Sequence, residues 1–192
     1  MRAIRPTIRL ARQEDAEALL PLIDAAGEGL PRHFWGQSTE PDETAQDVGL
    51  RRIKGESAGV SWRNAWVAEA TGGVAGVLIA QQLVAEPAQP PAAMPRIFAP
   101  LQALEALAPF TGYVNVLATV PALQGQGIGR ALMAFAEDRY RGPNGMSLIV
   151  ADNNARARAF YEGLGYAERA RRLMVKNGWQ GAGEAWILMV KP

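Results

Sequence analysis

The amino-acid sequence predicts one domain of mixed α/β (α+β) class over residues 1–192. Apolar residues recur with strand and helix spacings in the order β-α-α-β-β and then β-α-β-α-β-β. A glycine-rich turn near residue 72 joins two β-rich runs, which indicates a hairpin and therefore antiparallel strands. No internal repeat or linker divides the 192 residues, a length that suits a single core.

The first two elements are a strand and a helix. Residues 4–10 alternate apolar and polar side chains, which predicts a half-buried strand. Residues 13–26 place Leu19 and Ile23 at helical spacing, with acidic residues in the first turn and a glycine directly after the run. These residues predict an amphipathic helix.

The next region is expected to contain a second helix. Residues 29–40 predict a loop or a short helix. Thr39 or Asp42 is then expected to cap a helix that runs to about residue 57, with Val48 and Ile53 on its apolar side.

The middle of the chain predicts the hairpin and a long connection. Residues 65–70 and 74–83 are the two strands, because the glycines between them supply the positive φ that a tight turn needs. Residues 85–100, rich in proline and alanine, predict a surface loop. Residues 101–107 predict a short helix that ends before Pro109.

A strand, a glycine-rich loop and a helix follow. Residues 113–120 predict a central buried strand, which Pro121 ends. The glycine-rich loop covers residues 124–129. Residues 128–140 predict an amphipathic helix whose core-facing residues are Leu132, Met133 and Phe135.

The C-terminal part predicts a strand, a helix and a closing pair of strands. Residues 142–145 break the preceding helix, and residues 147–150 predict a buried strand. Residues 154–164 predict a short helix with Gly165 at its C-terminal end. Residues 166–176 and 185–191 predict two antiparallel strands.

Composition limits the classes of function. The formal net charge of +1 does not suit a surface that wraps nucleic acid. The chain has no cysteine and one histidine, His33, which excludes thiolate and multi-histidine metal sites, so we expect no metal. No run approaches the roughly 20 apolar residues that span a bilayer, and the first residues lack the apolar run of a signal peptide. We therefore expect a cytoplasmic protein with no membrane or nucleic-acid partner.

The loop Gln124-Gly125-Gln126-Gly127-Ile128-Gly129 places backbone N–H groups at the start of a helix. Such donors, with the positive end of the helix dipole, bind a diphosphate without cationic side chains. Arg130 follows at once and could add charge-assisted contacts. The spacing fits neither the dinucleotide pattern G-x-G-x-x-G nor the P-loop pattern with Gly-Lys-Ser/Thr, and a plain glycine-rich turn is the alternative interpretation.

Two motifs resemble one known family. Residues 117–132, LATVPALQGQGIGRAL, resemble the acetyl-CoA motif of the Gcn5-related N-acetyltransferase (GNAT) family, whose core pattern Gln/Arg-x-x-Gly-x-Gly/Ala is matched by Gln124, Gly127 and Gly129. Residues 154–166, NARARAFYEGLGY, resemble the family's second signature, N-x-x-A-x-x-x-Y-x-x-x-G-[FY]. Two motifs in the expected order are far more specific than either one alone.

The resemblance has consequences for both fold and activity. It implies a GNAT-type mixed, largely antiparallel sheet of six to seven strands, with helices on both faces and central strands that splay apart. It also implies an N-acetyltransferase, an acyltransferase that uses acetyl-CoA as cosubstrate and transfers the acetyl group by direct attack of an amine. Family members often form homodimers, so a homodimer is an open expectation.

The resemblance also assigns cofactor-binding residues. Main-chain groups of the strand would pair with the pantetheine arm, those of the loop would hold the pyrophosphate, and the Asn154 amide would hydrogen-bond the arm. The implied cofactor-binding residues are Leu117, Ala118, Thr119, Gln124, Gly125, Gln126, Gly127, Ile128, Gly129, Arg130, Asn154 and Tyr161. A helix N-cap is the alternative role for Asn154, and the two roles are compatible.

Tyr161 resembles the catalytic residue that acts as the family's general acid, which protonates the CoA thiolate as it leaves. A phenol with a pKa of about 10 is protonated at neutral pH and suits a thiol leaving group. The alternative is a tyrosine packed in the core with its hydroxyl group satisfied.

The general base stays open. Some family members carry a glutamate four positions before the first pantetheine-binding residue; here that position is Tyr113, with Asn115 next on the same face. Neither is a ready base at neutral pH. Glu69 is the best carboxylate candidate, His33 has the most suitable intrinsic pKa, and deprotonation through water is equally tenable.

The sequence does not identify the acceptor, which could be a small amine or a protein amino group. Several aromatic residues could line an apolar pocket for it or could belong to the core: Phe34, Trp35, Trp62, Trp66 and Phe98. Two other functions stay open, namely a sensor domain that binds acetyl-CoA without turnover and an enzyme of the same fold with another acyl-CoA or an alcohol acceptor. A nucleic-acid module is a distant third.

Overall fold

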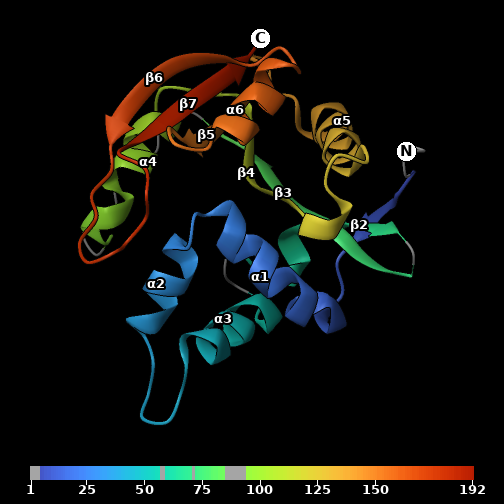
Figure 1. The fold of residues 1–192 in the computed structure, drawn as a ribbon. Helices are drawn as coiled ribbons and strands as arrows, with labels where there is room; N and C mark the ends of the chain where they lie inside the picture. Colours follow the sequence, from blue (N-terminus) through green and yellow to red (C-terminus); the bar gives the residue numbers. More distant parts are fainter. Residues whose placement is uncertain (1–4, 57–58, 71, 85–93) are drawn as a thin grey trace. The chain divides into compact units, whose positions relative to one another are not determined.

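The computed structural model describes residues 5–56, 59–70, 72–84 and 94–192 (Figure 1). In these residues a seven-stranded sheet has the strand order β1-β2-β3-β4-β5-β7-β6. The strands are β1 (Thr7–Leu10), β2 (Ala65–Ala70), β3 (Gly73–Gln82), β4 (Gly112–Thr119), β5 (Met146–Ala151), β6 (Ala167–Leu173) and β7 (Ala185–Lys191). The helices are α1 (Ala16–Ala26), α2 (Leu30–Gly36), α3 (Ala45–Lys54), α4 (Ala99–Glu105), α5 (Ile128–Tyr140) and α6 (Ala155–Glu162).

Strand pairing confirms the predicted mixed, largely antiparallel sheet flanked by helices. β1 pairs with β2, β2 with β3, β5 with β7, and β6 with β7, all antiparallel. β4 and β5 pair in parallel from Gly112↔Met146 to Val114↔Leu148. The expected splay of the central strands stays a prediction.

The chain folds as two compact units. The first comprises Met1–Ala80 and Val116–Ala136, and the second comprises Gln81–Asn115 and Glu137–Pro192. β4 passes from the second unit into the first after Asn115, and α5 returns to the second after Ala136. The expectation that residues 1–192 form a single domain stays a prediction.

In the first unit, α1, α2 and α3 pack together and share a core with β2 and β3 (Figure 1). A Cβ atom at Gly49 of α3 would lie 2.6 Å from both Leu20 Cδ1 and Trp35 Cε3, so α3 packs closely against its neighbours there. The buried side chains of this core include Leu19, Ile23, Trp35, Ile53, Val67 and Val77.

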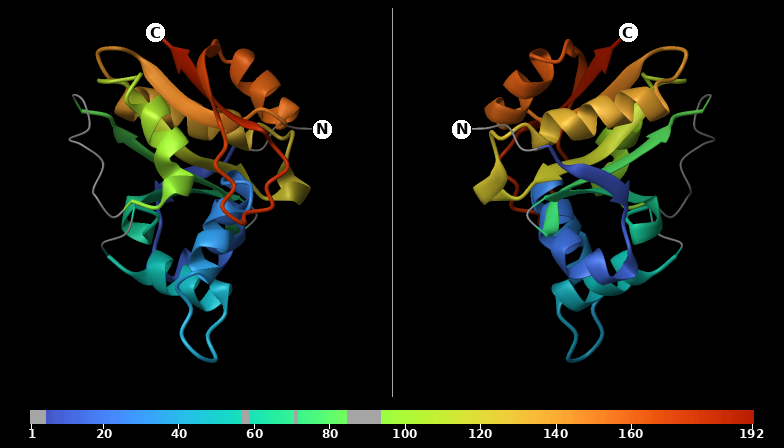
Figure 2. Two further views of the ribbon diagram at one scale, coloured as in Figure 1. Left: turned by 90° about the vertical axis from the view of Figure 1, so that its left-hand side faces the viewer. Right: turned by 90° about the vertical axis from the view of Figure 1, so that its right-hand side faces the viewer.

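The predicted N-cap of α3 is wrong. The cap is Thr44, whose Oγ1 accepts from the Asp47 backbone N–H at 3.3 Å, while the Asp47 carboxylate accepts from the Thr44 N–H at 2.9 Å. This reciprocal pair is a capping box, and it starts the helix later than Thr39 or Asp42 would. The helix also ends earlier than predicted, at Lys54. Figure 2 shows the segment between α2 and α3 as a loop that projects away from both helices.

In the second unit, β5, β6 and β7 form a sheet on which α4 packs (Figure 1). α4 begins at Ala99 rather than at the predicted residue 101. Pro100 fits in its first turn because the N–H that proline lacks would have no acceptor inside the helix at that position. β6 ends at Leu173, three residues before its predicted end. Part of the predicted proline-rich loop, residues 85–93, lies outside the described residues.

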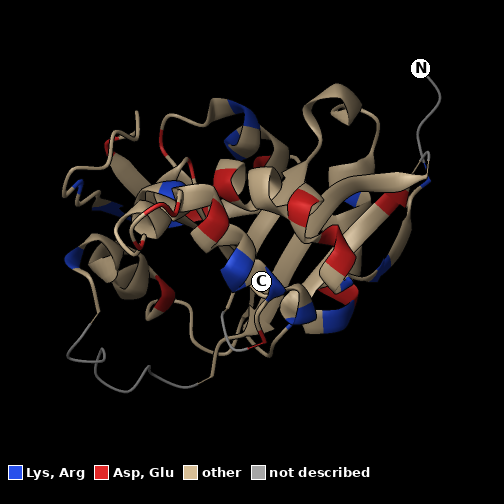
Figure 3. Ribbon diagram, turned by 90° about the horizontal axis from the view of Figure 1, so that it is seen from below, with Lys and Arg blue, Asp and Glu red and all other residues tan. Residues whose placement is uncertain are grey.

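Charges of both signs are interspersed along the described chain (Figure 3). Among the described residues, no helix is both long and apolar enough to cross a bilayer. The same residues contain no group of three or more histidine, aspartate or glutamate side chains placed to hold a metal ion.

Candidate functional site

In the first unit, the glycine-rich loop is tied back to the end of β4. The Val120 N–H donates to the Ala75 carbonyl of β3 at 2.9 Å, which fixes the strand end. Gln124 Nε2 donates to the Thr119 carbonyl at 3.4 Å, and Gln126 Nε2 donates to the Ala122 carbonyl at 3.4 Å. Both glutamine side chains therefore bond to the backbone that precedes the loop.

Two glycines give the loop its conformation. Gly125 has a φ of 76° and Gly127 a φ of 91°, values in the left-handed region that favours glycine. A Cβ atom at Gly125 would meet nothing within 4 Å. Glycine is required at this position by backbone conformation rather than by crowding, and the space beside it is open.

The loop ends at the N-terminus of α5. The Ala131 N–H donates to the Gly127 carbonyl at 3.0 Å, which is the first α-helical bond. The N–H groups of Ile128, Gly129 and Arg130 precede it and have no acceptor inside the helix. With the positive end of the helix dipole, such N–H groups have the arrangement that can bind an anion.

Sequence analysis missed Gly76, a glycine that allows β3 to pack closely against the start of α5. A Cβ atom at Gly76 of β3 would lie 2.9 Å from the Ala118 carbonyl and 3.1 Å from Ile128 Cγ2. β3 can therefore approach β4 and the start of α5 closely only because residue 76 has no side chain. Gly76 lies inside a strand, and a glycine there can mark such a close approach.

In the second unit, Asn154 caps α6. Its Oδ1 accepts from the Ala157 backbone N–H at 3.1 Å, and its own N–H donates to the Ala151 carbonyl at 3.1 Å. The N-cap role is thus confirmed. The proposed role of the amide in cofactor binding stays a prediction.

Tyr161 is buried between aromatic rings of the second unit. Its ring lies 5.2 Å from that of Phe160 and 6.0 Å from that of Tyr166, and the side chain is in the core. Burial raises the pKa of the Tyr161 hydroxyl, so it is fully protonated at neutral pH. Within the described residues this hydroxyl has no hydrogen-bond partner, unlike a structural core tyrosine. The group is free to donate to a ligand.

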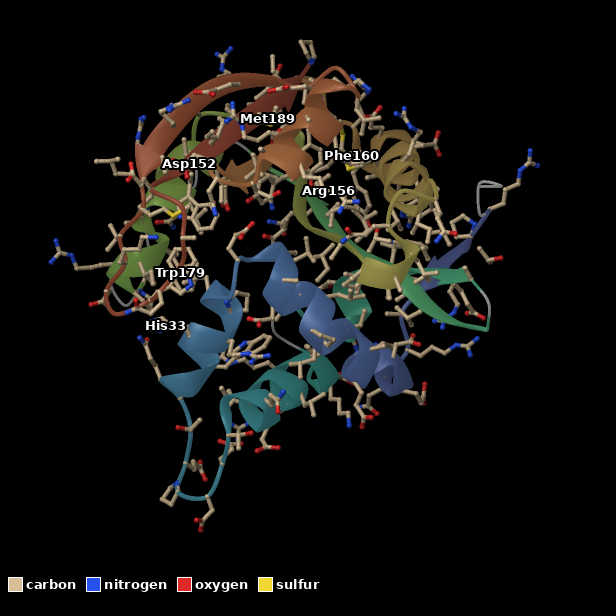
Figure 4. The ribbon with its side chains drawn as sticks, in the orientation of Figure 1. His33, Asp152, Arg156, Phe160, Trp179 and Met189 are labelled. Carbon is tan, nitrogen blue, oxygen red and sulfur yellow. The ribbon has the colours of Figure 1, made fainter. Side chains whose placement is uncertain are left out.

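Both base candidates from the sequence have polar partners, and which of them, if either, acts as the base stays open. Glu69 accepts from Arg9 Nε at 2.5 Å, and the same guanidinium binds Asp15 at 2.7 Å. Glu69 is therefore a structural ion-pair partner between β1 and β2. His33, labelled on α2 in Figure 4, lies with its Nε2 3.0 Å from Gln37 Nε2.

A half-buried carboxylate that sequence analysis did not single out, Glu105, lies in the second unit near the Tyr113 hydroxyl. Burial raises the pKa of Glu105, and the nearby Tyr113 hydroxyl partly offsets that rise. Burial and the nearby Glu105 both raise the pKa of Tyr113. A signal was present in the sequence, since Glu105 is the only acidic residue between Glu86 and Glu137.

Most of the aromatic residues expected near an acceptor have other roles. Trp35 belongs to the core, and Trp66 lies against Phe135 of α5 at 4.6 Å. Phe34 lies beneath Arg52, and Trp62 beneath Arg63. Phe98 is half-buried.

Sequence analysis missed a pair of stacked tryptophans in the second unit. The ring of Trp179, labelled in Figure 4 in the connection between β6 and β7, lies 5.7 Å from that of Trp186, nearly parallel to it. Lys176 Nζ lies 4.5 Å from the centre of the Trp179 ring.

Comparison with known proteins agrees with this geometry. The sequence model of the acetyltransferase (GNAT) family matches residues 30–166. A mycothiol acetyltransferase from Beutenbergia cavernae is 48% identical over 58 residues, which are 29% of this chain and 20% of that protein. The chain thus spans about a fifth of the length of that relative.

Two solved structures resemble the fold over nearly their whole length. An N-acetyltransferase from Staphylococcus aureus Mu50 superposes with a TM-score of 0.63 and 16% identity over 96% of this chain and 99% of that chain. The ribosomal-protein-S18-alanine N-acetyltransferase from Escherichia coli gives a TM-score of 0.57 and 20% identity over 98% and 94%. At these identities the likeness shows the fold alone. The family match covers more than half of the sequence, so the chain belongs to the acetyltransferase (GNAT) family and is a transferase of acyl groups.

Proposed function

We propose that the chain transfers an acetyl group from acetyl-CoA to an amine of a small molecule or a protein. The observation that carries this proposal is the loop before α5, where Gly125 and Gly127 adopt positive φ and unpaired N–H groups point out of a helix N-terminus. In a family that uses acetyl-CoA, such a site suits the pyrophosphate of the cofactor.

Each part of the cofactor then has a place along the chain. Backbone groups of Leu117, Ala118 and Thr119 would pair with the pantetheine arm, whose amides resemble peptide groups. The backbone from Gln124 to Arg130 would hold the pyrophosphate. Asn154 would use its amide on the arm while its Oδ1 keeps the cap of α6.

The reaction proposed is a direct acyl transfer. The neutral amine attacks the thioester carbonyl, a C–N bond forms, and the nitrogen gives its surplus proton to a base or to water, from which the Tyr161 phenolate is reprotonated after the reaction. The C–S bond breaks as Tyr161 gives its proton to the departing sulfur, which leaves as the CoA thiol. The raised pKa of Tyr161 keeps that proton in place until the sulfur develops negative charge. The chain's lack of cysteine agrees with a route that has no covalent enzyme intermediate.

Calorimetry with acetyl-CoA tests the binding half of the proposal. We expect the wild-type chain to bind, and Gly127→Glu to bind much more weakly, because a carboxylate at the loop repels the diphosphate. Gly72→Glu is the matched control: Gly72 has a φ of 81°, so it carries a similar backbone strain and the same charge but lies in the β2–β3 turn. If Gly127→Glu bound acetyl-CoA normally, the loop would not be the pyrophosphate site.

A screen for thiol release tests the catalytic half. Acetyl-CoA is incubated with primary amines, peptides with free N-termini, and amine-containing antibiotics, and free CoA is measured. Release with one class identifies the acceptor. Binding without release for every acceptor would favour the sensor function. Faster release from a longer acyl-CoA would mean that the enzyme transfers that longer acyl group rather than acetyl.

Four further expectations stay proposals: that residues 1–192 act as one catalytic domain, that the protein is cytoplasmic, that it binds neither nucleic acid nor membrane, and that it forms a homodimer. Light scattering after size exclusion tests the last. The acceptor of the mycothiol acetyltransferase is not carried over, because the shared segment is 29% of this chain.

A further inference from the structure

A groove lies in the second unit, where the start of β6, the end of β7 and the turn after α4 meet. Its volume is about 570 Å³, which is within the size range of sites that bind small molecules. The residues that line it include Leu107, Ala167, Glu168, Arg169, Ala170 and Val190. None of these is assigned above to acetyl-CoA or to the reaction, so the proposed function gives the groove no role.

Apolar side chains make up most of the lining. Leu107 follows α4, where its N–H donates to the Leu104 carbonyl at 3.0 Å, and its side chain is 41% exposed. Ala167 pairs with Val190 across β6 and β7, and Val190 and Ala170 are half-buried. The short alanine side chains leave room above the strand. An aliphatic group that covered Leu107 here would remove apolar surface from water, which is favourable.

A β-bulge places a positive charge in the same groove. The β7 partners of Glu168 and Ala170 are adjacent residues, so the register of β6 shifts between them and Arg169 has no partner of its own on β7. A bulge of this kind turns a side chain away from the regular alternation of a strand. Arg169 lines the groove and is exposed, and no hydrogen bond or ion pair joins its guanidinium to any residue that the structure describes.

The side-chain carboxylate in the lining, Glu168, already has cationic partners. It accepts from Arg171 Nε at 2.9 Å and from Arg171 Nη2 at 3.0 Å. Nη2 of Arg158 lies 3.9 Å from its Oε2. Glu168 therefore does not occupy the Arg169 guanidinium, which is left as a positive charge beside an apolar surface.

This charge favours a ligand with a single negative charge. The planar fork of one guanidinium matches one carboxylate. A phosphate dianion would bring a second charge close to Glu168, and Arg169 alone could not balance it. A second copy of the chain is also disfavoured, because pairing of two β6 strands would bring the same cluster of arginines together, namely Arg169, Arg171 and Arg172.

We propose that this groove binds an amphipathic monocarboxylate, with the carboxylate on Arg169 and the aliphatic chain against Leu107 and Val190. The binding does not depend on acetyl transfer, because it uses a different set of residues. The site would give the protein a second small-molecule ligand besides those of the proposed reaction.

Calorimetry with sodium octanoate tests the role of the charge. We expect the wild-type chain to bind octanoate, and octylamine, which has the same chain length and the opposite charge, not to bind. Arg169→Gln should weaken octanoate binding at least tenfold or so, because a charge-assisted hydrogen bond is lost. Arg172→Gln is the matched control: Arg172 is exposed on the same strand and does not line the groove, so the affinity should stay within about twofold.

A second pair of variants tests the groove itself. Ala167→Trp places a large ring in the groove and should abolish octanoate binding while it keeps Arg169. Leu173→Trp is its control, since Leu173 is 77% exposed on the same strand and lies outside the groove. Thermal melts should show that all four variants fold, because the substituted side chains are exposed.

The results separate this proposal from its alternatives. Failure of the wild-type chain to bind octanoate would overturn it, and so would equal binding by Arg169→Gln and Arg172→Gln. Tighter binding of octyl phosphate than of octanoate would show that the ligand is not a monocarboxylate. Gly127→Glu should bind octanoate like wild type, so the test stays valid even if the chain does not use acetyl-CoA. Loss of octanoate binding in Gly127→Glu would place the octanoate at the glycine-rich loop and overturn the proposal.

Discussion

The side-chain oxygen of Asn154 accepts a hydrogen bond from the Ala157 backbone N–H at 3.1 Å, so the residue that we assign to the cofactor also caps α6. Asn154 thus stabilises the start of α6 through Oδ1, which accepts a hydrogen bond, whereas its amide nitrogen can only donate one. These two contributions can be separated because aspartate has the same shape and caps helices equally well.

Asn154→Asp is expected to keep the helix cap and weaken acetyl-CoA binding. The carboxylate still accepts from Ala157, so the variant should keep the contribution of the cap to the free energy of unfolding, about 1 kcal/mol. It cannot donate a hydrogen bond, and it adds negative charge near a polyanionic cofactor. Thermal melts and calorimetry measure the two effects. Asn154→Ala is the counterpart, which should lose about 1 kcal/mol of stability as well. Unchanged affinity in Asn154→Asp would confine Asn154 to the cap.

Tyr161→Phe is expected to leave folding and acetyl-CoA binding intact and to lower turnover by about 10²-fold. Because the hydroxyl has no partner among the described residues, its loss should cost little stability. The lost general acid would leave the CoA thiolate to depart without a proton. Steady-state kinetics with an identified amine gives kcat, and calorimetry gives the affinity. Tyr166→Phe, which removes a neighbouring hydroxyl bonded to Glu137 at 3.3 Å, is the control. Equal turnover in wild type and Tyr161→Phe would remove Tyr161 from the acid role.

The parts of the fold that sequence analysis predicted well are those with local signals. The α5 bounds, residues 128–140, agree at both ends, because a glycine loop precedes the helix and a Gly-Pro-Asn-Gly break follows it. The β2–β3 hairpin also agrees, because Gly72 supplies the positive φ of the turn. The N-cap of α3 was wrong, since several residues before the helix can cap and only the bond between Thr44 and Asp47 selects one.

The residues of the candidate site also fall into two groups, those that local sequence signals predict and those that only the tertiary structure reveals. The conformation of the glycine-rich loop and the cap at Asn154 follow from residues close together in sequence. Glu105 does not, because its raised pKa arises from burial, which only the tertiary structure decides. Periodicity places Glu105 near a helix end and gives no reason to single it out. Gly76 was missed for the same reason, since only the tertiary structure brings Ile128 to it.

The buried hydroxyls of Thr111 and Ser147 should contribute unequally to stability. Thr111 Oγ1 donates to the Ala108 carbonyl at 2.7 Å and lies 2.6 Å from Ser147 Oγ, which must therefore donate to it. Ser147→Ala leaves the Thr111 bond in place and should cost about 1 kcal/mol. Thr111→Val leaves both the Ala108 carbonyl and the Ser147 hydroxyl without their hydrogen bonds to Thr111, and it should cost about 2 to 3 kcal/mol. Urea unfolding of the two variants checks the order, and a larger cost for Ser147→Ala would contradict this bond assignment.

The Arg9–Asp15 pair should make stability fall in acid. The hydrogen bond from Arg9 lowers the pKa of Asp15 below its unfolded value of 3.8. A folded pKa below the unfolded one means that the contribution is present above about pH 4 and disappears as pH falls through the folded pKa. Asp15→Asn should therefore cost roughly 1 to 2 kcal/mol at pH 7, and the cost should shrink as pH falls below the unfolded pKa of 3.8. Urea unfolding at about pH 7 and about pH 3 measures this difference. Glu17→Gln is the control: its side chain is 78% exposed and lies 3.8 Å from Lys54, so its effect should stay within about 0.5 kcal/mol at either pH. If the cost of Asp15→Asn did not shrink between pH 7 and pH 3, the ionised carboxylate of Asp15 would not be the source of the stability.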